Sequence, residues 1–268
     1  MSWIESLILG IIQGLTEFLP VSSSGHLAIA GTLFGLTGEE NLAFAILVHI
    51  ATVLSAIIVL WREVCGLCKG VVLFRWNDAT KMVSKLVLSM LPVGFIGLFF
   101  KDTVEQFFGG GLVFIGCMLI LTAALLLISY RPRPCRKEDI SFADAIFIGL
   151  AQACAVLPGL SRSGTTIAVG IWLGNDKAKA AKFSFLMLIL PVLGETFLDL
   201  IKVIKGSASI FSSFSVVALI CGFSAAFLSG LFACKWMIEL VKKGQLKYFS
   251  LYCLIAGLFV IIYSLLNS

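Results

Sequence analysis

The chain has 268 residues, of which 59% are apolar and only 13% charged, with a mean hydropathy of +1.05 and a net charge of +5. A soluble protein of this size has too little interior to hide so much apolar surface, so the composition excludes a soluble enzyme and a nucleic-acid-binding domain. It favours a helical protein that crosses the lipid bilayer several times, with its excess positive charge in loops on one side.

The apolar segments, taken in chain order, are of two lengths. The first, residues 3–19, lacks the Lys or Arg that precedes a signal-peptide core, so we expect it to remain in the mature protein. Segments 24–36 and 164–174 have 13 and 11 residues, whereas a crossing takes about 20. Each follows a break of Pro, Ser and Gly after a longer run, 3–19 or 142–157, and each pair therefore predicts a re-entrant helical hairpin. Six further runs are long enough to cross the bilayer: 42–61, 83–100, 112–130, 183–201, 210–234 and 249–266.

The two hairpin segments are copies of each other. A constant offset of 139 residues relates 8–35 to 147–174 and pairs identical residues throughout both stretches. The pairs are Gly10 and Gly149, Gln13 and Gln152, Ser22 and Ser161, Ser24 and Ser163, Gly25 and Gly164, Gly31 and Gly170, and Gly35 and Gly174. Each half, 1–130 or 140–268, then holds one hairpin and three crossings, and an odd number of crossings inverts the second half. The sequence predicts an all-α polytopic membrane protein with an inverted-topology repeat, six full crossings and two re-entrant helical hairpins.

Loop charge predicts the orientation of the chain. Sixteen of the 20 Lys and Arg residues lie in the loops 62–85, 131–139, 175–182 and 235–247. The positive-inside rule makes this side cytoplasmic. Both termini and the first hairpin then open to the outside, and the second hairpin enters from the cytoplasm.

Polar side chains gather at the two breaks, where their burial in the membrane is costly unless they are used. The first break and its flanks carry Gln13, Glu17, Ser22, Ser23, Ser24 and His26, and the second carries Gln152, Ser161, Arg162, Ser163, Thr165 and Thr166. The serines are good N-caps for the short helices that follow, and a helix start presents free N–H groups that bind anions. Two such starts facing each other predict an anion site near the midplane.

The charged and titratable residues at the breaks suit phosphate chemistry. Arg162 is a bidentate donor for phosphate, His26 can exchange a proton near neutral pH, and Glu17 can hold a divalent cation or act as a base. Gln13 lies one turn before Glu17 on the same helix face. On the residues alone, an enzyme that cleaves a phosphoanhydride and a transporter or flippase for a phosphorylated polyprenyl lipid or other anion fit equally well.

Two motifs carry a resemblance to a known family. Residues 13–26, QGLTEFLPVSSSGH, and 158–166, PGLSRSGTT, resemble the two signatures of the undecaprenyl-diphosphate phosphatase (bacitracin-resistance) family, and the resemblance covers essentially the whole chain. It implies an integral-membrane enzyme that hydrolyses undecaprenyl diphosphate to undecaprenyl phosphate and inorganic phosphate, which recycles the lipid carrier for cell-wall synthesis. Such an enzyme confers resistance to bacitracin, which sequesters the same lipid substrate. The resemblance further implies a site that faces the periplasm or exterior of the plasma membrane and uses Mg2+ or Ca2+.

The family also implies roles for individual residues. Glu17 corresponds to a functional carboxylate, Ser23 to a hydroxyl near the phosphorus, His26 to an acid, base or nucleophile, and Arg162 to a clamp on the diphosphate. The residues expected to bind substrate are Ser22, Ser24, Gly25, Ser161, Ser163, Gly164, Thr165 and Thr166.

One departure and two open questions accompany these roles. Many members carry a second Glu where this chain has Gln13, so the metal is expected on Glu17 with the carbonyl oxygen of Gln13, or mainly on the diphosphate itself. The nucleophile is left open among Ser23, His26 and water. A homodimer is a further arrangement that the chain could form, and small residues could pack helices closely at Gly222, Ser224, Ala225 and Ala226.

Overall fold

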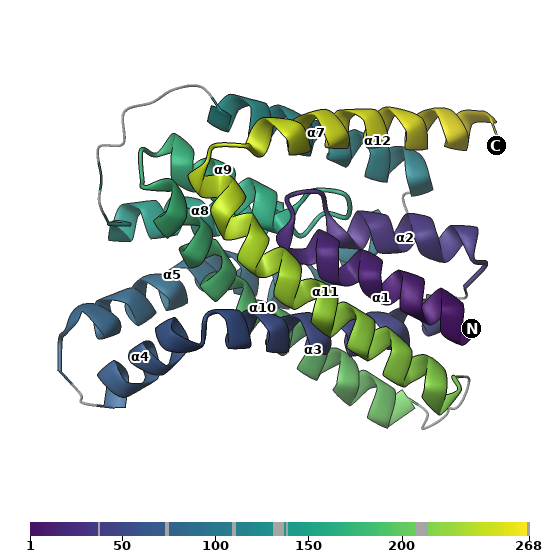
Figure 1. The fold of residues 1–268 in the computed structure, drawn as a ribbon, viewed down its shortest axis with the longest axis horizontal. Helices are drawn as coiled ribbons and strands as arrows, with labels where there is room; N and C mark the ends of the chain where they lie inside the picture. Colours follow the sequence, from purple (N-terminus) through teal and green to yellow (C-terminus); the bar gives the residue numbers. More distant parts are fainter. Residues whose placement is uncertain are drawn as a thin grey trace.

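A computed structural model describes residues 1–36, 38–72, 75–108, 111–130, 137, 139–206 and 214–266. Over these residues the protein is built from α-helices, and the only strand-like pairing is one isolated bridge between Lys137 and Asn175 (Figure 1). The first half contains α1 (Trp3–Phe18), α2 (Ser23–Leu33), α3 (Gly38–Val59), α4 (Trp61–Val72), α5 (Asp78–Phe99), α6 (Lys101–Phe108) and α7 (Gly111–Tyr130). The second contains α8 (Phe142–Cys154), α9 (Arg162–Trp172), α10 (Lys177–Gly206), α11 (Val216–Lys242) and α12 (Leu246–Leu266).

Several helices are long and apolar enough to span a membrane. Within the described residues, α5, α7, α11 and α12 meet this condition singly, and α3 with α4 makes a fifth candidate that is bent by 79°. The sixth predicted crossing, 183–201, lies in α10, where the side chains of 195, 196 and 198–200 are outside the described residues. The protein is therefore an all-α polytopic membrane protein.

Helix α4 occupies a stretch for which the sequence predicted a loop. Predicted loop 62–85 instead contains most of α4 and the start of α5, and none of the residues of α4 is buried. Arg62, Glu63 and Lys69 share this helix with apolar residues, so it has the composition of a helix at the membrane surface. In Figure 1, α4 turns away from the end of α3 and lies beside α5.

Both predicted hairpins are present as a helix, a break and a shorter helix. Helices α1 and α8 begin with the same capping box, in which Ser2 pairs with Glu5 and Ser141 with Asp144. The breaks fall between α1 and α2 and between α8 and α9, and both α2 and α9 have 11 residues. At about 1.5 Å per residue, such helices cover roughly half of a hydrocarbon core of about 30 Å. The beginning of α1 and the end of α12 lie at the same end of the bundle (Figure 1).

The two halves of the chain are interleaved. Helix α1 packs along α11, α8 packs along α5, and α7 lies beside α12 (Figure 1). Each hairpin therefore packs against a helix from the other half, and the pairs correspond under the 139-residue offset. The division into 1–130 and 140–268 as two repeats stays a prediction.

Small residues make the contact between α1 and α11 close. A Cβ atom on Gly10 would lie 2.4 Å from the carbonyl oxygen of Gly222, and one on Gly14 would lie 2.4 Å from that of Ala226. Gly222, Ala225 and Ala226 are all buried. The small-residue stripe of α11 thus packs a helix of the same chain, as small residues do in membrane bundles. Ser224, the fourth of these small residues, is exposed, and the homodimer stays a prediction.

We expect alanine at position 14 to destabilise the bundle. Its Cβ would also meet Ser229 Oγ at 2.0 Å, so the two helices must separate, and overpacking of this kind costs about 1–3 kcal/mol. The thermal unfolding midpoint of detergent-solubilised Gly14→Ala should fall below that of the wild type. Gly94→Ala is the control, because nothing lies within 4 Å of a Cβ placed on Gly94 of α5. Equal midpoints for the two variants would show that the contact is looser than described.

Ion pairs join the elements on the side that the sequence assigns to the cytoplasm. Lys137 pairs with Asp144 at 2.7 Å, and Lys179 pairs with Asp139 at 2.7 Å. The hydrogen bond from Lys179 and its positive charge lower the pKa of Asp139. Most of the predicted loop 131–139, namely residues 131–136 and 138, lies outside the described residues. The same is true of three side chains on the opposite side, those of the lysines at 101, 202 and 205. The orientation therefore stays a prediction.

Candidate active site

The two breaks, far apart in the sequence, lie against each other. A Cβ atom on Gly25 would be 3.2 Å from the Cα atom of Gly159, and one on Gly164 would be 3.0 Å from the Cβ atom of Pro20. The hydroxyl of Ser163 donates to the carbonyl oxygen of Leu19 at 3.4 Å. The starts of α2 and α9 are therefore neighbours inside the bundle, as expected if the two breaks share one site.

Matching serines cap these two helix starts. Ser22 Oγ accepts the N–H of Gly25 at 3.3 Å, and Ser161 Oγ accepts that of Gly164 at 3.1 Å. Each capping hydroxyl also contacts the serine two residues later, Ser24 at 3.3 Å and Ser163 at 3.4 Å. The predicted caps are thus present. The capping serine takes one N–H of each first turn, and helix starts of this kind bind anions through the others.

Ser22 holds the first break in an unusual backbone conformation. Its φ is +70°, and it is the single described residue other than glycine with a positive φ. This conformation costs about 1–3 kcal/mol and persists only where its surroundings impose it. Here the carbonyl oxygen of Ser22 accepts the backbone N–H of His26 at 3.1 Å and contacts its ring Nδ1 at 2.8 Å. The strained residue therefore fixes the histidine.

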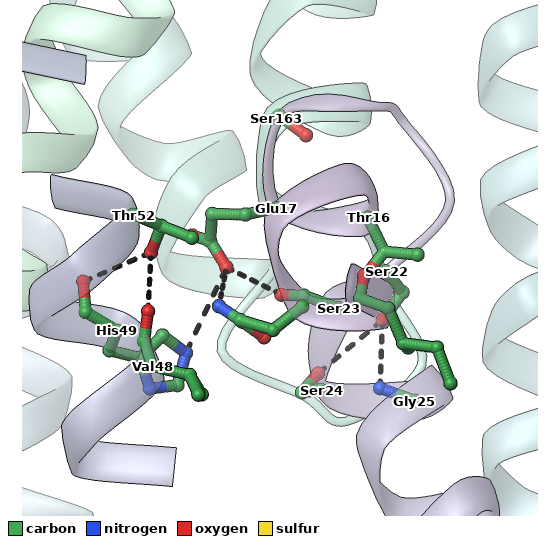
Figure 2. A network of polar contacts seen from close by, with 12 residues as sticks. Thr16, Glu17, Ser22, Ser23, Ser24, Gly25, Val48, His49, Thr52 and Ser163 are labelled. Atoms are coloured by element: carbon green, nitrogen blue, oxygen red, sulfur yellow. Dashed lines mark hydrogen bonds and ion pairs between the residues drawn. The ribbon is translucent and has the colours of Figure 1, made fainter. Parts of the chain in front are cut away.

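Glu17 is the centre of a buried polar network (Figure 2). Its Oε2 accepts hydrogen bonds from Ser23 Oγ at 2.7 Å and from Gln13 Nε2 at 2.8 Å. The Nε2 atom of His49 lies 3.8 Å from the same oxygen. Only 5% of the Glu17 side chain is exposed, so these neighbours replace the water that a carboxylate otherwise requires. A serine hydroxyl that already donates to a carboxylate is arranged to lose its proton.

His49 is a member of this network that the sequence reasoning missed. It lies on α3, and Thr52 one turn later donates to its carbonyl oxygen at 3.0 Å. The signal was present in the sequence, because His49 is one of only two histidines and interrupts an apolar run. Ionisable residues inside membrane segments are rare unless they are used.

The hydrogen bonds of His26 define its tautomer. A carbonyl oxygen can only accept a hydrogen bond, so Nδ1 carries the ring proton and donates it in the hydrogen bond to the carbonyl oxygen of Ser22. In the neutral ring, Nε2 is then an acceptor, and the hydroxyl of Tyr252 donates a hydrogen bond to it at 2.7 Å. The two rings also stack, with centroids 5.7 Å apart. Tyr252 comes from α12, 226 residues away, and no sequence pattern pointed to it.

The second break supplies Arg162 and a set of buried hydroxyl groups. Arg162 is the half-buried first residue of α9, between the capping Ser161 and the Ser163 that reaches Leu19. Figure 2 shows Ser163 next to the loop of the first break. The backbone of Arg162 therefore lies in the same region of the bundle as Ser23 and His26.

Of the remaining polar side chains of the second break, one makes a hydrogen bond within its own helix and another has no hydrogen-bond partner. Thr166 Oγ1 donates to the carbonyl oxygen of Arg162 at 2.9 Å, a bond within the helix. Thr165 Oγ1 is buried without a hydrogen-bond partner. Thr122 of α7, which the sequence reasoning missed, accepts the N–H of Ser161 at 3.1 Å and so holds the break in place. No sequence signal marks Thr122, because it lies in an ordinary apolar crossing.

The two halves do not contribute equally. Gln152, the repeat partner of Gln13, is fully buried, and neither end of its amide has a partner. The position that matches Glu17 under the offset of 139 is Val156. The second half therefore lacks the carboxylate, and the polar network around Glu17 occurs once.

The residues around Glu17 fit a divalent cation that also binds substrate oxygens. The described residues contain no group of three or more His, Cys, Asp or Glu side chains that could hold a metal alone. However, Gln13 Oε1 is fully buried and has no hydrogen-bond donor, one turn from the carboxylate of Glu17. Carboxylate and amide oxygens are ligands for Mg2+ and Ca2+, and Mg2+ commonly takes its remaining ligands from a phosphate.

Comparisons with known proteins identify the family of the chain. The family model described as "Bacitracin resistance protein BacA" matches residues 6–259. Proteins named undecaprenyl-diphosphatase are 60% identical in Parabacteroides distasonis, over 100% of both chains, and 60% identical in Bacteroides thetaiotaomicron, over 98% of this chain and 99% of that one. Another in Christiangramia forsetii is 45% identical over 98% of this chain and 99% of its own. The chain therefore belongs to the bacitracin resistance protein BacA family.

Proposed function

We propose that this protein is a membrane phosphatase that hydrolyses undecaprenyl diphosphate to undecaprenyl phosphate and inorganic phosphate. The observation that carries the proposal is the meeting of the two breaks, with the Ser23 hydroxyl hydrogen-bonded to Glu17. The relatives named undecaprenyl-diphosphatase, which match the chain over its full length, support the substrate. By releasing the monophosphate lipid carrier, the enzyme opposes bacitracin, which sequesters the diphosphate.

Binding of the diphosphate falls to the two helix starts and Arg162. Phosphate oxygens are commonly held by N–H groups at helix starts and by guanidinium groups. Here these donors are the N–H groups at the starts of α2 and α9 and the guanidinium of Arg162. The prenyl chain stays in lipid beside the bundle. Ser22, Ser161 and Ser163 are buried and Arg162 is half-buried, so donors at these helix starts stabilise the charge that develops on the phosphoryl group more strongly than they would in open water.

Ser23 is the nucleophile that the geometry favours. Its proton passes to Glu17 as Oγ attacks the terminal phosphorus, and the bond between that phosphorus and the bridging oxygen breaks. Undecaprenyl phosphate leaves with the bridging oxygen and its electron pair, and Ser23 carries the phosphoryl group. By contrast, the lone pair of His26 Nε2 is occupied by Tyr252.

The second step releases inorganic phosphate. Water attacks the phosphoserine and gives a proton to His26 Nε2, which exchanges the hydrogen bond from Tyr252 for one from this water. The Ser23 oxygen leaves and recovers a proton from Glu17. Glu17 and Gln13 would hold a divalent cation, Mg2+ or Ca2+, which neutralises phosphate charge when it is bound. Rapid quench with labelled substrate tests this order of events, because it predicts an acid-stable phosphoserine that Ser23→Ala does not form.

Phosphate release in detergent separates this enzyme from a transporter. An enzyme releases phosphate from undecaprenyl diphosphate without any sealed compartment, whereas a carrier requires two sides. We expect the purified protein to release phosphate in detergent, with the rate lost in a chelator and restored by a divalent cation. Intact lipid diphosphate after incubation with cation would exclude the proposed function.

The site is proposed to open to the exterior of the plasma membrane, or to the periplasm. The excess of Lys and Arg in the loops opposite the first hairpin supports this orientation. A membrane-impermeant thiol reagent tests it in intact cells. Cys68 on α4 is exposed in the bundle and should be protected by the cytoplasmic location of that helix.

Removal of the Tyr252 hydroxyl should slow the enzyme moderately. Tyr252→Phe keeps the ring that stacks on His26 but loses the 2.7 Å hydrogen bond to Nε2, so the imidazole is held less firmly. A neutral hydrogen bond is worth about 0.5–1.5 kcal/mol, which predicts a fall of about two- to thirteenfold in kcat/KM. Tyr248→Phe on the same helix is the control, since Tyr248 is largely exposed. Unchanged kcat/KM in Tyr252→Phe would remove the positioning role.

A further inference from the structure

The imidazole of His49 lies beside Glu17 at a distance that suits an ion pair or a cation shared by the two side chains. Nε2 lies 3.8 Å from Glu17 Oε2, which is too long for a hydrogen bond. His49 belongs to α3, and 26% of its side chain is exposed, against 5% for Glu17. The only other histidine, His26, has both ring nitrogens in hydrogen bonds, whereas His49 Nε2 has its contact with Glu17.

We infer that His49 is a ligand of the divalent cation, together with Glu17 and Gln13. The inference rests on the proposed function, because it concerns the cation of that site. Metal ions bind imidazole nitrogen and carboxylate oxygen at about 2.0–2.2 Å, so one ion can touch two atoms that are 3.8 Å apart. Gln13 Nε2 is the amide atom that faces Glu17 Oε2, so the amide must turn over for the buried Oε1, which lacks a donor, to become a third ligand atom.

The donor set changes which cation the site prefers. Ca2+ takes six to eight oxygen ligands and Mg2+ is held by one or two carboxylates, whereas this site has a single carboxylate, an amide and an imidazole. Imidazole is a ligand for transition metals, which bind mixed N and O sites more tightly than Mg2+ or Ca2+ do. The chain therefore has a site for an ion such as Mn2+, in which the nitrogen of His49 takes the place of a second carboxylate at position 13.

The second half has no copy of this set at the matching positions. Under the offset of 139, His49 corresponds to Leu188 and Glu17 corresponds to Val156, so the second half cannot bind a cation in the same way. A mixed site confined to the first half agrees with the position of Ser23, whose hydroxyl shares Glu17 Oε2 with the imidazole. His49 thereby acts on the same carboxylate as the proposed nucleophile.

Electron paramagnetic resonance of bound Mn2+ tests the assignment without measuring turnover. The probe is Mn2+ added to tag-free protein in detergent, with and without methylenediphosphonate as an uncleavable diphosphate. We expect the wild type to show electron spin echo modulation from a directly bound 14N nucleus. His49→Gln should lose this modulation and bind Mn2+ at least about tenfold more weakly, since loss of a metal-site partner costs about 10–100-fold. Ca2+ affinity should change by less than about twofold.

Only two imidazoles exist in the chain, so a matched control is available. His26→Gln removes the other one and should keep the 14N modulation. Modulation that survives in His49→Gln, or Mn2+ that binds the wild type without 14N modulation, would overturn the assignment. Failure of Mn2+ to bind even with methylenediphosphonate would also overturn it. Phosphate release by the same wild-type preparation, measured in parallel, shows whether the proposed function survives that result.

Discussion

Replacement of Arg162 by alanine should lower kcat/KM for phosphate release by about a thousandfold while the protein still inserts and folds. Arg162 begins α9 at the point where the second break meets the first, next to Ser163, whose hydroxyl reaches Leu19. Loss of a single donor that stabilises a transition state costs about 10²–10³, and an arginine that clamps a transferring phosphoryl group can be worth more. The measurement is phosphate release by the purified variant in detergent.

Two further variants show whether the geometry of the guanidinium matters. Arg162→Lys keeps the charge but not the paired donors, so it should recover only part of the lost rate. Arg62→Ala removes an arginine from α4, away from the breaks, and should retain wild-type activity. A normal rate in Arg162→Ala, with a normal elution profile, would mean that the guanidinium of Arg162 does not clamp the diphosphate.

The sequence was informative about the site wherever the signal was local. Helix starts, breaks and caps depend on neighbours within a few residues, and the serines at 22 and 161 cap α2 and α9 as expected. Repetition at an offset of 139 also linked the two breaks, which lie together in the fold. The neighbourhood of Glu17, Ser23 and Gln13 followed from their spacing along one hairpin.

Residues that other helices bring to the site were missed. Tyr252 reaches His26 from α12, and Thr122 reaches the second break from α7. Their positions depend on which helices pack together, and one sequence contains no direct record of that packing. His49 differs, because an ionisable residue in an apolar run is itself a signal.

The small residues of α11 and the segment after α3 illustrate the same limit. Gly222 and Ala226 indicate close packing, but only the fold shows that the partner is α1 of the same chain. Likewise, charged residues after position 61 suggested a loop, although they alternate with apolar residues along α4. Composition marks such a segment as outside the hydrocarbon core, and helical periodicity decides its local structure.

The second large effect is expected for Glu17→Gln, which keeps the size of the side chain and removes its charge. Ser23 Oγ and Gln13 Nε2 both donate to Glu17 Oε2, at 2.7 and 2.8 Å, and an amide is far too weak a base to take the serine proton. Loss of a general base costs about 10²–10⁴ in rate, so kcat should fall by about a thousandfold. Glu5→Gln on the same helix is the control, because glutamine also serves in the capping box with Ser2.

A double variant separates the two ways in which Glu17 can act. If its only role is to activate Ser23, then Glu17→Gln combined with Ser23→Ala should be no slower than Ser23→Ala alone, since residues that act as a unit are not additive. If Glu17 also holds the cation, a further loss appears in the double variant, and Mn2+ affinity falls with it. Additive losses without any change in Mn2+ affinity would contradict both roles, because Glu17 would then act neither through the serine nor through the metal.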